Sequence, residues 1–265
     1  MNLKDITLQV VALTKSVGEF ISQEGQSFTS DQIQTKSKNS LVSYVDQTAE
    51  KKLVEGLKSI LPEAGFITEE ETVKNETKEI NWIVDPLDGT TNFMHQIPVF
   101  SISIALMKDE EIIAGVVYEV NRQEAFYAFK DGGCFLNDHP IKVTNTAAFK
   151  DTLIATGFPY YDYTYLPKYL NTLSHLMNET RGIRRLGSAA VDLAYVAAGR
   201  FDSFYEYSLH PWDVAAGAIL VKEAGGVVND FKGGNDFLFG KEILASNPHI
   251  QPLMLNLLKE HFNND

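Results

Sequence analysis

The sequence has little cysteine and little positive charge. Its single cysteine, Cys134, has no partner for an intramolecular disulfide, and no cysteine or histidine near it completes a zinc motif. A reducing compartment fits this composition, so we expect a cytoplasmic protein. Lysine and arginine number 23 against 35 acidic residues, a net charge of −12, which disfavours nucleic acid and anionic membranes as partners. The acidity is compatible with binding of divalent cations, which take carboxylate oxygens.

Long apolar runs are also missing. The most prominent uncharged run, residues 97–107, is much shorter than the roughly 20 residues that a membrane helix requires. Lys4 and Asp5 near the start are followed by a helical pattern rather than a continuous apolar segment, with no small-residue cleavage site. We therefore expect neither a membrane span nor a signal peptide.

What is present is the composition of a globular protein with a large core, because 44% of the residues are hydrophobic and 22% are charged. The 265 residues would suffice for about two domains of roughly 150 residues each. No repeat, low-complexity tract or long linker divides them. We expect one domain over residues 1–265, with lobes of about residues 1–145 and 146–265.

The periodicity of apolar residues predicts α+β structure in the first lobe and alternating α/β structure in the second. Asp46 stands where an N-cap is expected, and residues 24–44 are predicted to form a loop or loose hairpin. The predicted helices cover residues 3–21, 46–61, 167–178, 188–198, 212–223 and 248–261. The predicted strands cover residues 65–67, 82–84, 99–107, 112–120, 124–129, 153–156, 183–186, 201–205 and 226–228.

The most informative string is Trp-Ile-Val-Asp-Pro-Leu-Asp-Gly-Thr-Thr-Asn-Phe, residues 82–93. An apolar strand is predicted to end at Asp85, and Asp88 follows three residues later, so both carboxylates can face one cavity. Two carboxylates this close repel each other unless a cation such as Mg²⁺ lies between them. Residues 89–91 begin a predicted helix, whose free amide groups favour an anion. The alternative is an ordinary turn, because Asp-Pro and Asp-Gly are common turn sequences.

Two further acidic segments point the same way. Glu69 belongs to a run of three glutamates after an apolar strand, and Asp213 lies in the first turn of the predicted helix at residues 212–223. We single out Glu69 as the glutamate that points into a site. The alternatives are a solvated charge run for the glutamates and a helix-dipole cap for Asp213.

These three segments, in this order and at these separations, resemble the motifs of the inositol monophosphatase family, whose members are Mg²⁺-dependent, Li⁺-inhibited phosphatases. The resemblance covers nearly the whole chain. It implies an α/β (α+β) fold, a layered αβαβα sandwich, and a homodimer. It also implies hydrolysis of a small phosphorylated substrate, inositol monophosphate in the first place, with no phosphoenzyme.

The resemblance also implies roles for individual residues. One Mg²⁺ would be held by Glu69, Asp85 and the carbonyl of Leu87, and a second by Asp85, Asp88 and Asp213, with a weaker third ion sharing Glu69. Thr90 and Glu69 would orient the attacking water, with Asp46 supporting them, while the amides of Gly89 and Thr90 hold the phosphate. The residues matching the family's contacts to the inositol ring are Gly187, Ser188, Ala189, Glu206 and Asp213.

Several assignments stay open at this stage. Ser188 could be only an N-cap, and Glu206 only an exposed residue at a strand end. Arg185 lies near the same turn, where it could form only a structural ion pair. His210 precedes Asp213 by three positions, and we interpret it as structural and leave it out of the site. Ser40 stands where the family has an aspartate, which leaves Li⁺ sensitivity and the affinity for a third ion undetermined.

Other enzyme classes fit the sequence less well. The spacing of Asp85 and Asp88 is one residue too long for an aspartyl-phosphate motif, and neither a P-loop nor a Gly-x-Ser-x-Gly elbow is present. Two alternatives remain. The same chemistry could act on fructose 1,6-bisphosphate, NADP or another small phosphate, or the protein could be a divalent-metal-binding regulator without catalysis.

Overall fold

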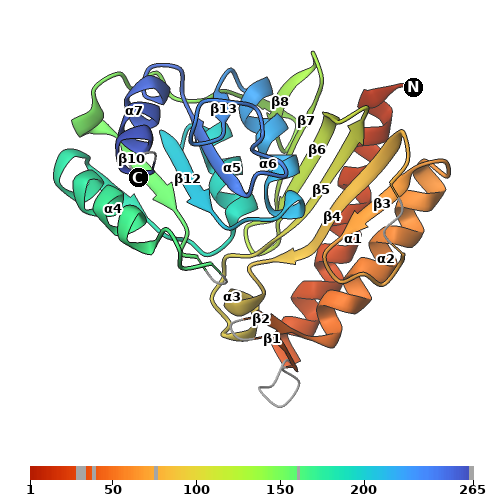
Figure 1. The fold of residues 1–265 in the computed structure, drawn as a ribbon. Coiled ribbons are helices and arrows are strands. Elements are labelled where there is room, and N and C mark those ends of the chain that lie inside the picture. Colours follow the sequence, from red (N-terminus) through yellow and green to blue (C-terminus); the bar gives the residue numbers. More distant parts are fainter. Residues whose placement is uncertain (28–33, 38–39, 75–76, 160–161, 263–265) are drawn as a thin grey trace.

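The computed structural model describes residues 1–27, 34–37, 40–74, 77–159 and 162–262, and describes only the backbone of residues 34–37 and 40–42. Within these residues the chain builds five layers: a helix pair, a seven-stranded sheet, a second helix pair, a five-stranded sheet and a third helix pair (Figure 1). The predicted αβαβα order is confirmed. No helix in the described ranges is long and apolar enough to cross a membrane.

The first outer layer consists of α1 (Leu3–Ser27) and α2 (Tyr44–Ile60), which cover one face of the seven-stranded sheet. The sheet follows chain order, with β3 and β4 parallel and every later neighbour antiparallel. Its strands are β3 (Gly65–Thr68), β4 (Ile80–Asp88), β5 (Ser101–Lys108), β6 (Glu111–Glu119), β7 (Glu124–Phe129), β8 (Gly133–Leu136) and β9 (His139–Ile141). Two short antiparallel strands, β1 (Gln34–Ser37) and β2 (Ser40–Val42), precede α2. For residues 24–44 the sequence predicted a loop or a loose hairpin, and the hairpin is present.

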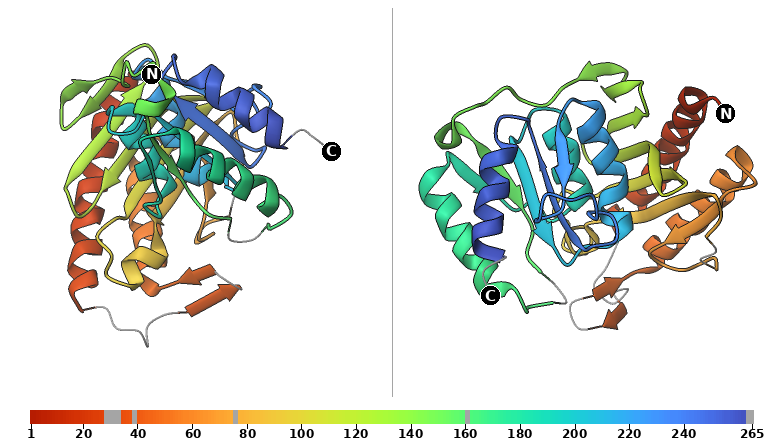
Figure 2. Two further views of the ribbon diagram at one scale, coloured as in Figure 1. Left: turned by 90° about the vertical axis from the view of Figure 1, so that its left-hand side faces the viewer. Right: turned by 45° about the horizontal axis from the view of Figure 1, so that its top comes forward.

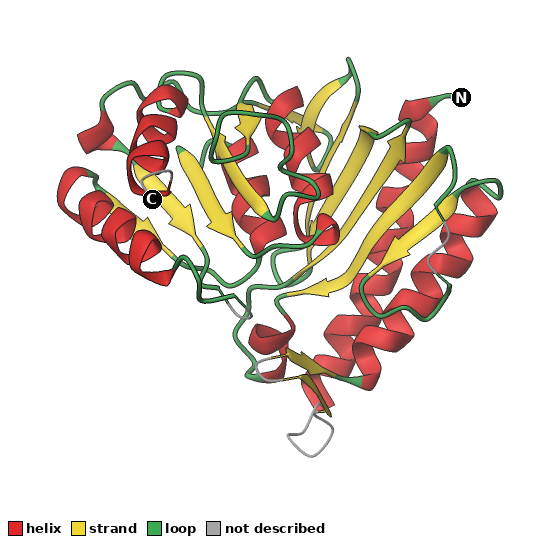
Figure 3. Ribbon diagram, viewed as in Figure 1, coloured by secondary structure: helices red, strands yellow, loops and turns green. Residues whose placement is uncertain are grey.

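The second half forms the remaining layers. Two helices, α5 (Ala189–Ala197) and α6 (Pro211–Glu223), lie between the sheets, and α4 (Leu166–Glu179) and α7 (Gln251–Phe262) cover the outer face of the five-stranded sheet (Figure 2). A 3₁₀ turn, η2 (Phe149–Asp151), leads into that sheet. Its strands in spatial order are β11 (Gly182–Arg184), β10 (Leu153–Thr156), β12 (Ser203–Tyr207), β14 (Glu242–Ser246) and β13 (Val227–Asn229). Figure 3 shows the two sheets separated by the central helices.

The start of α2 differs from the sequence prediction. Ser43, with φ −123° and ψ 169°, is the N-cap, and its hydroxyl accepts a hydrogen bond from the Val45 amide. Asp46 is the third helical residue, and its carboxylate accepts the Ser43 amide at 2.8 Å. The assignment of Asp46 as N-cap was therefore wrong, because the two residues form a reciprocal capping box three positions apart.

The end of β4 also differs. We expected the strand to stop at Asp85, but Asp85 pairs with Ser103 and Asp88 pairs again with Ser101 after a register shift. Pro86 lies within this irregular stretch, where the ladder requires no amide from it. The bulge carries both aspartates on one continuous strand.

Three strands were not predicted at all. The β8–β9 hairpin and β14 are short, and β14 begins with the charged residue Glu242. β14 pairs with both β12 and β13, so tertiary pairing rather than a local pattern defines it. One apolar cluster contains buried residues of both sheets and of α5 and α6. We propose on this basis that residues 1–265 form one domain.

Candidate active site

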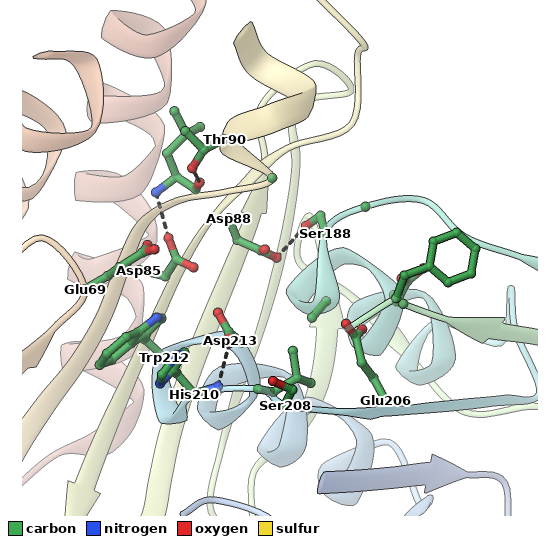
Figure 4. A pocket seen from close by; sticks show the side chains of 18 of the residues that line it. Glu69, Asp85, Asp88, Thr90, Ser188, Glu206, Ser208, His210, Trp212 and Asp213 are labelled. Carbon is green, nitrogen blue, oxygen red and sulfur yellow. Dashed lines mark hydrogen bonds between the residues drawn. The ribbon is translucent and has the colours of Figure 1, made fainter. Parts of the chain in front are cut away.

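One pocket lies where the two halves meet, at the ends of β4 and β12 and the starts of α5 and α6 (Figure 4). Every predicted site residue lines this pocket except Asp46, which is buried behind it. The lining consists of Glu69, Asp85, Leu87, Asp88, Gly89, Thr90, Gly157, Phe158, Arg185, Gly187, Ser188, Ala189, Asp192, Glu206, Ser208, Leu209, His210, Trp212 and Asp213.

Four carboxyl groups, from Glu69, Asp85, Asp88 and Asp213, form an acidic cluster on one side of the pocket (Figure 4). Oxygen atoms of Asp85, Asp88 and Asp213 lie within 4.8 Å of one another, and Glu69 is hydrogen-bonded to Asp85. Burial and the neighbouring carboxylates raise the pKa of Glu69, Asp85 and Asp213 well above their ordinary values. Burial also raises the pKa of Asp88, to about 6.

The composition of the acidic cluster suits a hard divalent cation. Its donors are all oxygen atoms, and among the described residues none of the four carboxylates forms an ion pair with a lysine or arginine side chain. A bound cation would remove the mutual repulsion that raises these pKa values. The residues present therefore fit Mg²⁺.

Hydrogen bonds hold the two aspartates of β4 in place. The carboxylate of Asp85 accepts the Leu87 amide at 2.9 Å, across the bulge. Asp88 accepts the Ser188 hydroxyl at 2.5 Å and the Ala190 amide at 2.7 Å. Ser188 is also the N-cap of α5, since its side chain accepts the Val191 amide. Ser188 thus connects the first lobe's acidic residues to the second lobe's helix.

The turn after β4 depends on a glycine. Gly89 has φ +95°, and a Cβ there would lie 3.1 Å from the Val99 carbonyl oxygen, so a larger residue would be strained. The turn directs the Thr90 hydroxyl between two acceptors, Asp46 Oδ1 at 3.1 Å and the Leu87 carbonyl at 3.0 Å. Asp46 therefore reaches the pocket through Thr90, although it does not line it.

Asp213 comes from the second lobe, in the first turn of α6, where its carboxylate accepts the His210 amide at 2.6 Å. The rings of His210 and Trp212 are stacked, with centroids 4.8 Å apart, and form a wall of the pocket. Burial and Lys241 lower the pKa of His210. His210, which we interpreted as structural, therefore lies in the pocket wall beside Trp212.

Glu206 lies at the opposite side of the pocket from Glu69 (Figure 4). Its exposed fraction is 6%, so the alternative of an exposed strand-end residue was wrong. Burial and the charge of Asp88 raise the pKa of Glu206 to about 8, while Arg185 opposes the shift. Arg185, for which a structural ion pair was left open, also lines the pocket.

Two residues of this region were missed by the sequence analysis. Glu50 of α2 is fully buried, and its carboxylate accepts the Glu70 amide, the Thr72 amide and the Thr72 hydroxyl, each at 2.7 Å. It fixes the segment that begins directly after Glu69. Asp192 of α5 is 1% exposed and lines the pocket. The available signal for both was an acidic residue on the apolar face of a helix. The Ser40 side chain lies outside the described part of the chain.

Comparison with known proteins agrees with the motifs. A family model described as the inositol monophosphatase family matches residues 2–263. A protein named inositol-1-monophosphatase from Mesorhizobium japonicum is 40% identical over 252 residues, covering 95% of each chain. The Nus factor SuhB of Escherichia coli K12 is 37% identical over 254 residues, covering 96% of this chain and 95% of that protein.

Solved structures show the same fold. The crystal structure of the extragenic suppressor protein suhB from Bartonella henselae matches with a TM-score of 0.89 and 40% identity. The match covers 98% of this chain and 99% of that one. The predicted family and layered fold are confirmed.

Proposed function

The chain belongs to the inositol monophosphatase family, and we propose that it is a Mg²⁺-dependent phosphomonoesterase that hydrolyses inositol monophosphate to inositol and phosphate. The observation that carries the proposal is the acidic cluster, in which Asp85, Asp88 and Asp213 offer oxygen atoms within 4.8 Å of one another inside a pocket. A curated relative named inositol-1-monophosphatase supports the choice of substrate.

The ligands for two or three Mg²⁺ ions would be the carboxylates of Glu69, Asp85, Asp88 and Asp213 and the carbonyl of Leu87. Bound there, Mg²⁺ would lower the pKa of a water and neutralise charge on the phosphate and the departing oxygen. The fit rests on the all-oxygen donor set and on the absence of ion pairs at these four carboxylates within the described residues.

The protein's own groups would position the attacking water. The Thr90 hydroxyl donates to Asp46 or to the Leu87 carbonyl, so its oxygen retains lone pairs that can accept a hydrogen bond from water. Glu69, on the same side of the pocket, would accept the other proton of that water. The water oxygen would attack phosphorus as Glu69 takes the water's proton, and the bond from phosphorus to the alcohol oxygen would break. The alcohol oxygen would take a proton from solvent, and Glu69 would return its proton to solvent.

The remaining lining would hold the substrate's two ends. The amides of Gly89 and Thr90 begin α3 (Thr90–Met94) and would bind phosphate oxygens, because the first amides of a helix have no partner inside it. Glu206 and Asp213 would bind ring hydroxyls, together with the turn of Gly187, Ser188 and Ala189. Since the Ser188 hydroxyl is already bonded to Asp88, we assign it the further task of fixing that aspartate.

A homodimer is part of the proposal. Apolar side chains on and beside α4 are unusually exposed, including Leu170 at 51% and Met177 at 68%. Leu170 and Met177 are seven positions apart and so lie on the same face of α4, which a second subunit would cover in the proposed dimer. Light scattering after size-exclusion chromatography measures the oligomeric state directly. A monomer at micromolar concentration would contradict the proposed homodimer.

The competing proposal is a metal-binding regulator without turnover, which one specific finding favours: a relative with 37% identity is named a Nus factor. Both proposals predict that Mg²⁺ raises the melting temperature, so only turnover separates them. Rates of phosphate release from fructose 1,6-bisphosphate and NADP, compared with the rate from inositol monophosphate, distinguish the alternative substrates.

The experiment measures phosphate release from myo-inositol 1-phosphate, fructose 1,6-bisphosphate, NADP and 3′-phosphoadenosine 5′-phosphate. Each is tested with Mg²⁺, with EDTA, and with Mg²⁺ plus Li⁺. Mg²⁺-dependent release that is fastest on inositol phosphate is expected. If another substrate is hydrolysed fastest, the proposed reaction stands and that substrate replaces inositol monophosphate. If no substrate releases phosphate although calorimetry shows that Mg²⁺ binds, the result favours the regulator.

A further inference from the structure

Asp192 is a buried acidic residue that the family motifs quoted above do not include. It lies in the first turns of α5, lines the pocket, and has an exposed fraction of 1%. Its Oδ1 is buried and has no hydrogen-bond partner in the described part of the protein. Buried carboxyl oxygens are nearly always hydrogen-bonded, because losing water without replacement costs free energy. Asp192 contributes to the pocket wall, so a rotation of its side chain on ligand binding would give this oxygen its missing partner.

Folding of α5 does not explain this aspartate. The N-cap of the helix is already Ser188, and an acid in the first turn adds only a modest interaction with the helix dipole. Nearly every other residue of α5 is a buried apolar one, so Asp192 is a carboxyl group on an otherwise apolar, buried helix. Helix formation alone does not account for the burial of this carboxyl group.

The surroundings of Asp192 define a subsite. Burial, Glu206 and Asp88 raise the pKa of Asp192, and Arg185 lowers it, so Asp192 lies near both acids and the guanidinium group. The Glu206 carboxyl packs against Gly157, where a Cβ would lie within 2.0 Å of Oε2. The Arg185 guanidinium lies over the Phe158 ring, 5.4 Å from its centroid. Two carboxyl groups and one guanidinium thus border the side of the pocket away from Glu69.

This set of groups matches a polyol better than a second phosphate. Two neighbouring acids repel an additional anion, whereas hydroxyl groups both donate to carboxylates and accept from protonated carboxyls or guanidinium. Asp88 belongs to the acidic cluster and also lies near Glu206 of this subsite. A substrate whose phosphate lies at the acidic cluster would therefore place its alcohol portion here.

We propose that Asp192 acts together with Glu206 to bind hydroxyl groups of the substrate's alcohol portion, and that Asp192 determines specificity for polyol phosphates. The inference rests on the proposed phosphatase function. It assigns Asp192 no role in metal binding or in attack on phosphorus.

The test replaces Asp192 by leucine, which has a similar shape and no polar group, and compares two substrates. For myo-inositol 1-phosphate, kcat/KM is expected to fall about tenfold or more, mainly through KM, since lost hydrogen bonds to a substrate hydroxyl reduce binding. For p-nitrophenyl phosphate, which has no hydroxyl on its leaving group, kcat/KM should stay within about twofold. The half-saturating Mg²⁺ concentration should not rise, and the melting temperature should not fall.

The Asp192→Asn variant is the second measurement, and it decides the question if Asp192→Leu fails to fold. Its amide can still bond to hydroxyls, so its loss on inositol phosphate should be smaller than that of the leucine variant and absent on p-nitrophenyl phosphate. Asp131→Asn, an exposed site far from the pocket, is the matched control.

Two results with Asp192→Leu would overturn the inference: equal losses on both substrates, which indicate structural support, or an unchanged rate on inositol phosphate. A wild-type protein that hydrolyses p-nitrophenyl phosphate but no polyol phosphate would also overturn it while leaving the phosphatase activity standing. No turnover of either substrate by the wild type would instead refute the proposed function.

Discussion

The two sides of the pocket use buried carboxyl groups differently. The acidic cluster brings Asp85, Asp88 and Asp213 within 4.8 Å of one another and has no ion pair within the described residues. On the other side, Arg185 opposes the rise in the pKa of both Asp192 and Glu206, whereas in the acidic cluster it opposes the rise at Asp88. The same residue type thus suits a cation on one side and hydroxyl groups on the other. Neighbouring charges, rather than the carboxyl groups themselves, determine which ligand each side favours.

The largest effect is expected for Asp88→Asn, which tests the acidic cluster. The change removes one charged oxygen ligand but preserves shape, so phosphate release should fall by about 10³-fold or more while the fold is retained. Initial rates at saturating Mg²⁺ and circular dichroism measure the two quantities. An Asp88→Asn protein with near wild-type rates would refute the proposed metal ligands, and Asp131→Asn controls for loss of a surface charge.

A smaller loss is expected for Glu50→Gln, which leaves every pocket residue in place. The glutamine amide cannot accept all three hydrogen bonds that Glu50 receives from Glu70 and Thr72. Displacement of the neighbouring Glu69 should cost about 10–100-fold in Mg²⁺ affinity or activity, the usual effect of residues that hold metal ligands. The matched control is Glu55→Gln, an exposed position of the same helix.

A Glu50→Gln protein with an unchanged half-saturating Mg²⁺ concentration and unchanged kcat would show that Glu50 only stabilises the loop. Thermal unfolding then becomes the relevant readout. A lower melting temperature with normal kinetics would confirm that limited role.

The metal-free protein should lose stability as pH rises. Burial raises the pKa of Asp88 to about 6 and that of Glu206 to about 8, while the unfolded chain has ordinary values near 4. At pH values above the unfolded pKa near 4 and below each raised folded pKa, the folded state binds more protons than the unfolded state. The free energy of unfolding therefore falls as pH increases. In EDTA, the melting temperature should decrease by several degrees from pH 5 to pH 9.

Two variations of that experiment separate the two sides of the pocket. Added Mg²⁺ should reduce the fall in melting temperature that ionisation of Asp88 causes, because the cation neutralises ionised carboxylates. Without metal, Glu206→Gln should reduce the fall in melting temperature between about pH 6 and pH 8, where Asp88 has ionised and Glu206 is still protonated in the folded protein. A melting temperature that is constant or rises over this range would contradict the proposed burial of protonated acids.

The smallest effect is expected at Cys134. The thiol is buried and its pKa is raised to about 12, chiefly by burial, so it carries almost no thiolate near neutral pH. Iodoacetamide should leave phosphate release unchanged, and Cys134→Ala should change it less than about twofold. Inactivation by the reagent, prevented in Cys134→Ala, would connect the activity to a thiol that the carboxyl chemistry does not use.

The local motifs were sufficient for one side of the pocket. Asp85 and Asp88 are three residues apart on one strand, so sequence proximity alone implied that they share a site. Pro86 and Gly89 marked the irregular backbone around them. The motifs also carried the resemblance to the family, which implied the layered fold, while the helix and strand patterns indicated only an α+β first lobe and an α/β second lobe.

The other side depended on tertiary structure. Asp192 and Glu206 are 14 positions apart and come from a helix and a strand, and only the packing of α5 against β12 brings them to one subsite. Glu50 likewise precedes its partner Thr72 by 22 positions. Burial raises the pKa of Asp192 and Glu206 and places Glu50 where it accepts hydrogen bonds from the backbone. Whether a charged residue is buried depends on packing, which no local pattern of hydrophobicity specifies.

The sequence by itself determined the acidic motifs, each made of residues close together in the chain, and the resemblance that these motifs carry implied the family, the order of layers and the joining of Asp213 to the other acids. Only the tertiary structure decided that Asp46 reaches the pocket through Thr90, that Glu206 is buried, and that Asp192 has an unpartnered oxygen. The physical reason is that dielectric surroundings and hydrogen-bond partners are properties of the packed molecule, so chemically identical side chains acquire different roles only after the chain has folded.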